Sequence, residues 1–290
     1  MKDIKPFLTY EEQVNHLMAQ GLYIGDRKYA VNVLSTVNYY RLINAYALGL
    51  YTDKTKAEFK EGTTFQQIYS LYQFDAILRH IMTELLESFE IMFRTKLAYY
   101  IGKHYGSLGY MDAANFANAE YHKEFMDKLV QEKKDRKKSP IVKHHNHEYG
   151  GEMPIWATVE ILTFGSFSKL YSNLKDSDQN TIAQQLHTSP QYLVSWLFSF
   201  VEVRNICAHY GRLYNMPLVF PPRMYPECKH INNRRIFAVL YTLKRFTPEE
   251  QWETLMLRLR TALKRYPAVN LEYIGFPQDW ENLLGLSEAN

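Results

Sequence analysis

The sequence lacks the patterns that mark several large classes of protein. It has only two cysteines, Cys207 and Cys228, which are too few for a disulfide framework and favour a reducing compartment. No apolar run approaches the roughly 18 residues that a membrane-spanning helix needs, and the N-terminus lacks the apolar core of a signal peptide. We therefore expect a soluble cytoplasmic protein without a membrane partner.

Strong charge and cofactor motifs are absent as well. The net charge is only +3, so RNA contacts would have to come from local patches such as the basic run at 133–138, which is either a solvated face or a flexible phosphate-binding segment. There is no P-loop or GxGxxG motif. The histidine cluster at 144–147 has no second ligand pair at zinc-finger spacing, so we assign it to a mobile loop and predict no metal and no cofactor. A Gly165-Ser166 pair followed by Asp176 and Asp178 superficially resembles a nucleotidyltransferase signature, but its surroundings have a helical pattern.

Helical patterns occupy most of the chain. Capping signals at Thr9, Asp26 and Thr64 predict helix starts, and no stretch alternates persistently with the period of a strand. The longest pattern runs from Phe65 to about His104, a length at which we expect a bend or break. The polar residues 51–63 are predicted to form a loop. The sequence predicts an all-α fold, divided into an N-terminal helical region (1–60), a helical bundle (61–246) and a C-terminal helical extension (247–290).

Four charged residues of the long helical pattern form pairs at i,i+4 spacing. These pairs, Asp75 with Arg79 and Glu90 with Arg94, are typical of helix stabilisation. Alternatively, Glu90 or Arg94 supports a functional site from a facing helix.

A second helix stands out by its apolar character. Between Leu193 and Val203, eight of eleven residues are apolar and point in nearly every direction, so we expect this helix to be buried all round. Burying polar groups in such a helix costs free energy unless they are hydrogen-bonded or paired, so their presence suggests a functional role. On an ideal helix one stripe contains Glu202, Asn205, His209 and Arg212. Arg204 lies roughly 140° from His209.

Polar residues of these types can serve chemistry on a phosphate group. Histidine can transfer a proton near neutral pH, and arginine offers a permanent cationic fork for phosphate oxygens. Asparagine can orient either partner or bind phosphate. The alternative is a buried polar network of Glu202, Arg204 and His209 that only fixes helix packing.

The same residues carry a family resemblance. Arg204-Asn205-Ile206-Cys207-Ala208-His209 fits the Arg-x4-His motif of HEPN ribonucleases. The longer string RNICAHYGRLYN (204–215), together with NYYRL (38–42), resembles the Abi-like abortive-infection proteins of the AbiD/AbiF type, which are themselves similar to the HEPN domains of type VI CRISPR effectors. The resemblance extends from about Thr9 to Asn215. It implies a HEPN-like helical bundle with additional N- and C-terminal helices.

The resemblance also implies roles for individual residues. Arg204 and His209 would be the catalytic pair, with Asn205 as the orienting residue. HEPN ribonucleases form their cleft from two facing motifs, and this chain has one, so a homodimer is expected. Candidate RNA contacts are Tyr210, Arg212, Asn215 and Arg41, and candidate supporting residues are Glu202 and Glu90.

Two functions follow from this resemblance. The first is a metal-independent endoribonuclease of an abortive-infection or toxin system, which cuts RNA by attack of its own 2′-hydroxyl. The alternative is a non-catalytic HEPN protein with an RNA-binding or regulatory role, for which a small non-coding RNA is a candidate partner.

Overall fold

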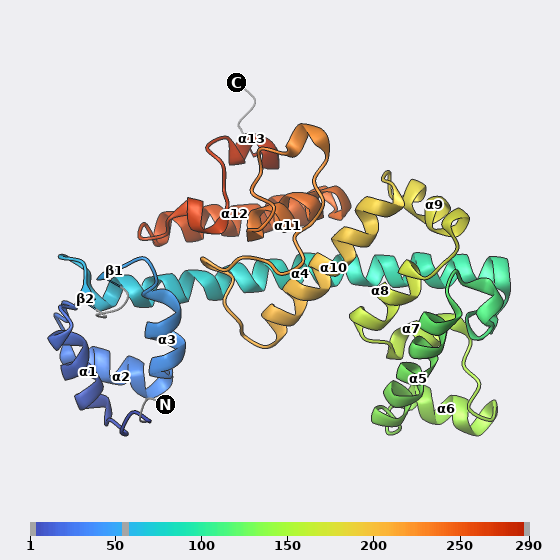
Figure 1. Ribbon diagram of the computed structural model, residues 1–290, viewed down its shortest axis with the longest axis horizontal. Coiled ribbons are helices and arrows are strands. Elements are labelled where there is room, and N and C mark those ends of the chain that lie inside the picture. Colours follow the sequence, from blue (N-terminus) through green and yellow to red (C-terminus); the bar gives the residue numbers. More distant parts are fainter. Residues whose placement is uncertain (1–3, 54–57, 287–290) are drawn as a thin grey trace.

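One long helix organises the molecule. A computed structural model describes residues 4–53 and 58–286, and its helix α4 (Phe65–Tyr105) runs along the whole length of the structure (Figure 1). With 41 residues it is roughly 60 Å long. The expected break does not occur: Thr64 and Gln67 form the predicted capping box, and the helix continues without interruption to Tyr105. Its buried residues are spread over its full length, so packing supports every turn.

Three short helices and a hairpin pack at the N-terminal end of α4 (Figure 1). They are α1 (Tyr10–Ala19), α2 (Arg27–Thr36), α3 (Tyr39–Tyr46) and the antiparallel strands β1 (Tyr51–Asp53) and β2 (Glu58–Phe59). Thr9 and Asp26 cap α1 and α2 as predicted. The prediction of a loop over residues 51–63 is wrong at the two strands, where the Tyr51 and Phe59 rings pack with centroids 4.6 Å apart and planes tilted by 33°. Part of this segment, residues 54–57, lies outside the described residues.

A second group of helices packs around the C-terminal end of α4 (Figure 1). It comprises the 3-10 turns η1 (Gly109–Met111) and η2 (Ala113–Asn115) and the helices α5 (Ala119–Asp135), α6 (Pro140–Glu148), α7 (Ile155–Ile161), α8 (Phe164–Ser172) and α9 (Asp176–Gln185). The histidine cluster lies in α6, so the prediction of a mobile loop is wrong. Pro140 starts this helix at its first position, and the His145 ring bonds to the Ile141 carbonyl at 2.8 Å.

The nucleotidyltransferase-like residues are structural here. Ser166 lies in α8 and donates to the buried carboxylate of Glu132 at 2.6 Å. Asp178 lies in the first turn of α9 and accepts hydrogen bonds from the hydroxyls of Tyr100 and Tyr105. No strands flank these residues, and all of them lie in the described part of the chain.

Helix α10 (Pro190–Ala208) packs against the middle of α4, and the remaining elements cover the other side of α4 (Figure 1). These are η3 (Pro226–Cys228), α11 (Ile236–Leu243), η4 (Lys244–Phe246), α12 (Glu249–Arg265), η5 (Leu271–Ile274) and α13 (Trp280–Leu284). The fold is therefore all-α, as predicted, with one small hairpin. No helix in residues 4–53 and 58–286 is both long and apolar enough to cross a membrane.

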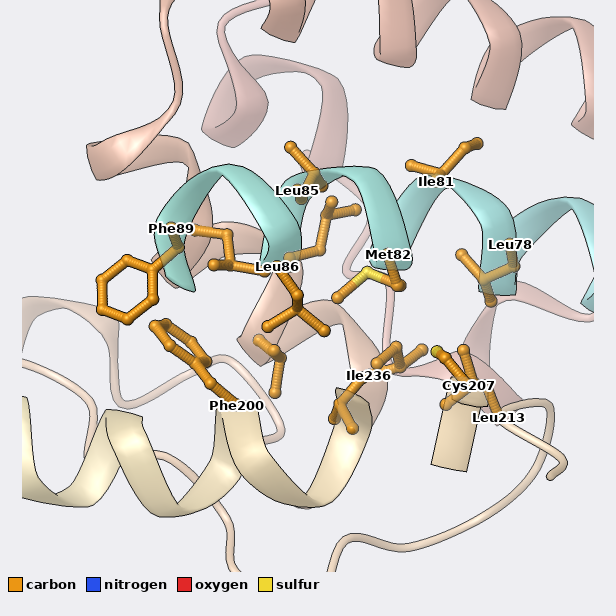
Figure 2. Packing of buried hydrophobic residues seen from close by; sticks show 14 of the residues in the cluster. Leu78, Ile81, Met82, Leu85, Leu86, Phe89, Phe200, Cys207, Leu213 and Ile236 are labelled. Carbon is orange, nitrogen blue, oxygen red and sulfur yellow. The ribbon is translucent and has the colours of Figure 1, made fainter. Parts of the chain in front are cut away.

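The core between α4 and α10 fixes the position of the predicted site. Figure 2 shows Met82 and Phe89 of α4 on the side that faces Phe200 and Cys207 of α10. The Phe89 and Phe200 rings meet edge to face with centroids 4.8 Å apart. Because these side chains are almost completely buried, the C-terminal end of α10 is held firmly against α4.

Candidate active site at the end of α10

Helix α10 has one buried and one exposed side. Leu193, Leu197 and Phe200 are fully buried, whereas Phe198 and Asn205 are exposed. The expectation that this helix is buried all round is therefore wrong. Val194 and Val201 are half-buried and pack against the edge of the core.

The helix ends in a tight turn immediately after the motif. His209 is the C-cap, and Tyr210 adopts a left-handed backbone conformation with φ 55°. The Tyr210 amide donates to the Cys207 carbonyl at 3.1 Å and the Gly211 amide to the Ile206 carbonyl at 2.7 Å, which is the hydrogen-bond pattern of a Schellman turn. Glycine usually occupies the left-handed position of this turn, and a tyrosine there costs roughly 1–2 kcal/mol.

This turn corrects the predicted stripe of polar residues. Because α10 stops at Ala208, Arg212 lies beyond the helix and does not continue the face of Asn205. Gly211 ends the helix as the second residue of the turn. A Cβ atom there would lie 2.9 Å from Cγ2 of Ile206.

Arg204 and Asn205 lie side by side on the exposed side of α10. Nη1 of Arg204 donates to Oδ1 of Asn205 at 3.2 Å, and Nε of Arg204 lies 3.8 Å from Oε2 of Glu90. The same Glu90 forms a much less exposed ion pair with Arg94, whose guanidinium also donates to the Leu162 carbonyl at 2.8 Å. Glu90 therefore anchors Arg94 first and contacts Arg204 more loosely.

The surroundings of Arg204 are acidic. A pocket of about 510 Å³ adjoins it, and the charged residues that line this pocket are Glu87, Glu90, Glu160, Arg94 and Arg204. Three carboxylates therefore face two guanidinium groups. We refer to this hollow as the acidic pocket.

Glu202 does not join the motif. Its two carboxylate oxygens accept hydrogen bonds from the backbone amides of Val219, at 2.8 Å, and Phe220, at 2.7 Å. It fixes the proline-rich connector to α10 instead. The alternative of a buried network of Glu202, Arg204 and His209 is wrong, because Glu202 has other partners and the remaining two side chains reach solvent.

His209 lies exposed at the end of α10. Among the hydrogen bonds and ion pairs of the described residues, none involves its imidazole ring; only its backbone amide is bonded, to the Asn205 carbonyl at 3.0 Å. The ring is therefore available to a substrate or to another chain.

Three of the predicted RNA contacts meet in a second pocket. Arg41 of α3 donates to the Tyr210 carbonyl, and Arg212 donates to the Ala45 carbonyl of α3. These two arginines and Tyr210 line a pocket of about 570 Å³, which has no carboxylate among its described lining residues. We refer to it as the basic pocket. Asn215 lies elsewhere: it has φ 52° and accepts a hydrogen bond from Arg235 at 3.4 Å.

A buried carboxylate holds the segment that follows the motif. Asp75 of α4 is completely buried, pairs with Arg79 at 2.7 Å and accepts the Tyr46 hydroxyl at 2.6 Å. It also accepts hydrogen bonds from the backbone amides of Leu213 and Tyr214. Burial raises the pKa of Asp75, and the Arg79 guanidinium and these hydrogen bonds oppose that rise.

Sequence reasoning assigned Asp75 and Arg79 only to a local pair within one helix. The i,i+4 pair exists, but Asp75 also connects α4, α3 and the segment after α10, and Arg79 donates to the Gly211 carbonyl at 3.2 Å. The sequence offered one signal, an aspartate at the buried face of a long helix, which is costly without several partners.

Residues capable of holding a metal are not grouped in this part of the molecule. Across residues 4–53 and 58–286, no three His, Cys, Asp or Glu side chains are placed together as metal ligands.

Comparison with protein families identifies the chain. The family model described as Abi-like protein matches residues 32–215, which is more than half of the sequence. The chain therefore belongs to the Abi-like protein family. The match includes α3, α4 and α10 and ends at Asn215, so both pockets and Asp75 lie within it. Searches of curated proteins and of solved structures gave no match.

Proposed function

We propose that this Abi-like protein is a metal-independent endoribonuclease of the HEPN type that acts in abortive infection, the phage defence suggested by its family. The observation that carries the proposal is the exposure of Arg204, Asn205 and His209 at the end of a helix whose opposite side is tightly packed. Polar residues that served only packing would be buried and satisfied within the chain.

The proposed reaction needs no group beyond the protein and its RNA. The 2′-oxygen attacks the adjacent phosphorus and gives up its proton, the bond from phosphorus to the 5′-oxygen breaks, and that oxygen takes up a proton. The products are a 2′,3′-cyclic phosphate and a 5′-hydroxyl. His209 performs one of the proton transfers, and Arg204, oriented by Asn205, stabilises the charge that develops on the phosphate.

The proposal includes a homodimer. Arg204 points toward Glu90 and the acidic pocket, whereas His209 lies one and a half turns later at the end of α10. A second copy related by a two-fold axis would bring His209 of one protomer to Arg204 of its partner. The exposed residues at the C-terminal end of α10, Asn205, Ala208 and His209, offer a surface for that contact.

The first test is cleavage of labelled single-stranded RNA in EDTA. We expect cleavage by the wild-type protein with 2′,3′-cyclic phosphate ends, and loss of cleavage in Arg204→Ala and His209→Ala. His147→Ala, an exposed histidine on α6 at the far end of α4, serves as the matched control and should cleave normally.

The other outcomes are equally informative. Binding without cleavage would favour the non-catalytic RNA-binding or regulatory protein. Cleavage that survives in His209→Ala would contradict the assigned chemistry. If wild-type protein neither binds nor cleaves RNA, the nuclease proposal fails.

A further inference from the structure

The basic pocket is lined by arginines and tyrosines that take no part in the proposed proton transfers. Its volume of about 570 Å³ lies within the range of roughly 300–1,000 Å³ typical of small-molecule sites. It lies between α3 and the turn after α10, next in the chain to His209. A ligand in this pocket would therefore be adjacent to the proposed reaction centre.

The charges in the pocket favour an anion. Each of the two arginines, Arg41 and Arg212, donates to one backbone carbonyl, which leaves most of the five N–H groups of a guanidinium for a ligand. Burial lowers the pKa of Arg212, although arginine stays charged in proteins. The nearest carboxylate that acts on Arg212, Asp75, is already paired with Arg79 and does not line the pocket, so both guanidinium groups can gain from a phosphate partner.

Two exposed aromatic rings border the same pocket. Tyr40 of α3 is 75% exposed and Tyr210 is 71% exposed. Exposed aromatic rings beside cations are the arrangement with which proteins hold unpaired nucleic-acid bases, because every base can stack on a ring. Asn44, also exposed in this pocket, offers an amide donor and acceptor to a base edge.

The backbone of Tyr210 supplies an independent argument. This residue takes the left-handed position in which glycine is favoured, and its ring gains little burial in return. A strained residue at a functional site is typically kept because the strain places a side chain. The Arg41 bond to the Tyr210 carbonyl holds the turn against α3 and so fixes the ring at the pocket.

We infer that the basic pocket binds one unstacked nucleotide of single-stranded RNA. The base stacks on Tyr210, and a neighbouring phosphate contacts Arg41 and Arg212. The inference rests on the proposed function and specifies its substrate class: the nuclease acts on single-stranded RNA whose bases can be turned out, and the pocket holds the nucleotide next to the one that is cut.

The test measures binding alone, in a His209→Ala background, by fluorescence anisotropy with a short labelled single-stranded RNA and the matching duplex. Tyr210→Gly should weaken single-strand binding roughly tenfold, the loss of one stacked base, while its thermal midpoint stays at or above that of the parent. Tyr210→Phe, which keeps the ring, should bind within about twofold of the parent. The duplex should bind more weakly than the single strand.

Matched controls lie outside the pocket. Tyr121→Ala removes a ring that is 61% exposed on α5, and Arg27→Gln removes an arginine of α2 that donates to Asn15. Both should bind like the parent, whereas Arg41→Gln should weaken binding severalfold. Equal binding by Tyr210→Gly and its parent would overturn the inference, and so would a preference for the duplex.

The assays separate the two proposals. If the wild-type protein cleaves RNA in EDTA while Tyr210→Gly both binds and cleaves normally, the nucleotide pocket is refuted and the nuclease stands. If Tyr210→Gly loses binding but the wild-type protein never cleaves, the pocket stands and the nuclease is refuted.

Discussion

The two ends of the segment from Arg204 to Arg212 face opposite electrostatic environments. At the first end, the acidic pocket sets three carboxylates against two guanidinium groups. At the other end, the basic pocket contains Arg41 and Arg212 with no carboxylate among its described lining residues. A phosphate chain suits the second environment and is repelled by the first.

The two ends also differ in how firmly they are held. Arg204 contacts Glu90 only loosely, whereas the turn at Tyr210 is fixed to α3 and α4. Under the proposed function, the loosely held Arg204 is the residue that meets the second protomer. If the partner's basic pocket adds its positive charge near Arg204, the composite cleft can accept RNA that a single protomer would repel at that end.

The largest expected effect is on the cleavage rate, when two inactive variants that each lack one of the motif's proposed catalytic residues are mixed. Arg204→Ala and His209→Ala should each cleave at least a hundredfold more slowly than the wild type, because each removes a group of the proposed transition state. In the proposed dimer, a mixed pair of variants retains one Arg204 facing one His209 across the two-fold axis. Cleavage after mixing should therefore recover to a sizeable fraction of the wild-type rate.

Dimer mass and rate should be followed together, by analytical ultracentrifugation and gel assay. If the mixture stays as inactive as its components although mixed dimers form, Arg204 and His209 do not act as a pair across chains. Arg204 and His209 would then have to act together within one protomer.

Removing the carboxylate that joins α4 to the segment after α10 should reduce stability most. Asp75→Asn leaves Arg79 buried without its counter-ion, so we expect the free energy of unfolding to fall by about 3 kcal/mol, measured by urea denaturation. The control is Glu84→Gln, which breaks an ion pair to Arg258 that is exposed on both sides and should cost less than about 1 kcal/mol. Equal losses would mean that Asp75 does not fix this segment.

The glycine of the turn should tolerate no side chain. Gly211→Ala places a Cβ 2.9 Å from Cγ2 of Ile206 and 3.1 Å from its carbonyl oxygen, so we expect a loss of about 1–2 kcal/mol of stability and weaker RNA binding. Gly165→Ala in α8 is the matched control, because its Cβ would meet Val201 at an ordinary 3.8 Å, and it should stabilise by up to about 1 kcal/mol. Thermal denaturation of both variants checks the pair, and a stable Gly211→Ala would contradict the assigned role of the turn.

The smallest expected effect is on the salt dependence of RNA affinity, measured for one variant in each of the two pockets. In the His209→Ala background, Arg41→Gln should reduce the slope of log affinity against log salt by about 0.7, the value for one phosphate contact on a single strand. Glu87→Gln, an exposed residue of the acidic pocket, should leave that slope unchanged. If both variants change the slope equally, the RNA does not distinguish the two pockets.

Local chemistry allowed most helix starts to be predicted. Thr9, Asp26 and Thr64 cap α1, α2 and α4 as expected, because a capping side chain and its amide lie within a few residues of each other. The two i,i+4 ion pairs of α4 were predicted for the same reason. The candidate residues of the motif could be named because their types and spacing are local features as well.

Predictions that depended on distant partners fared differently. Residues 51–63 looked like a loop, since a three-residue strand carries no periodic pattern. Residues 144–147 looked mobile, although packing holds them in α6. The apolar composition of α10 suggested burial on all sides, because composition does not reveal which side another element covers.

The sequence by itself determined the helical class and the main capping sites, and it supplied the candidates for proton transfer and phosphate binding. Only the tertiary structure decided how they are combined. Arg41 meets Tyr210 from 169 residues away, Asp75 reaches the amides of Leu213 and Tyr214, and Glu202 leaves the motif to bind the connector. The physical reason is that capping and ion pairing act over a few residues, whereas a buried polar group is satisfied by whichever backbone the fold brings beside it.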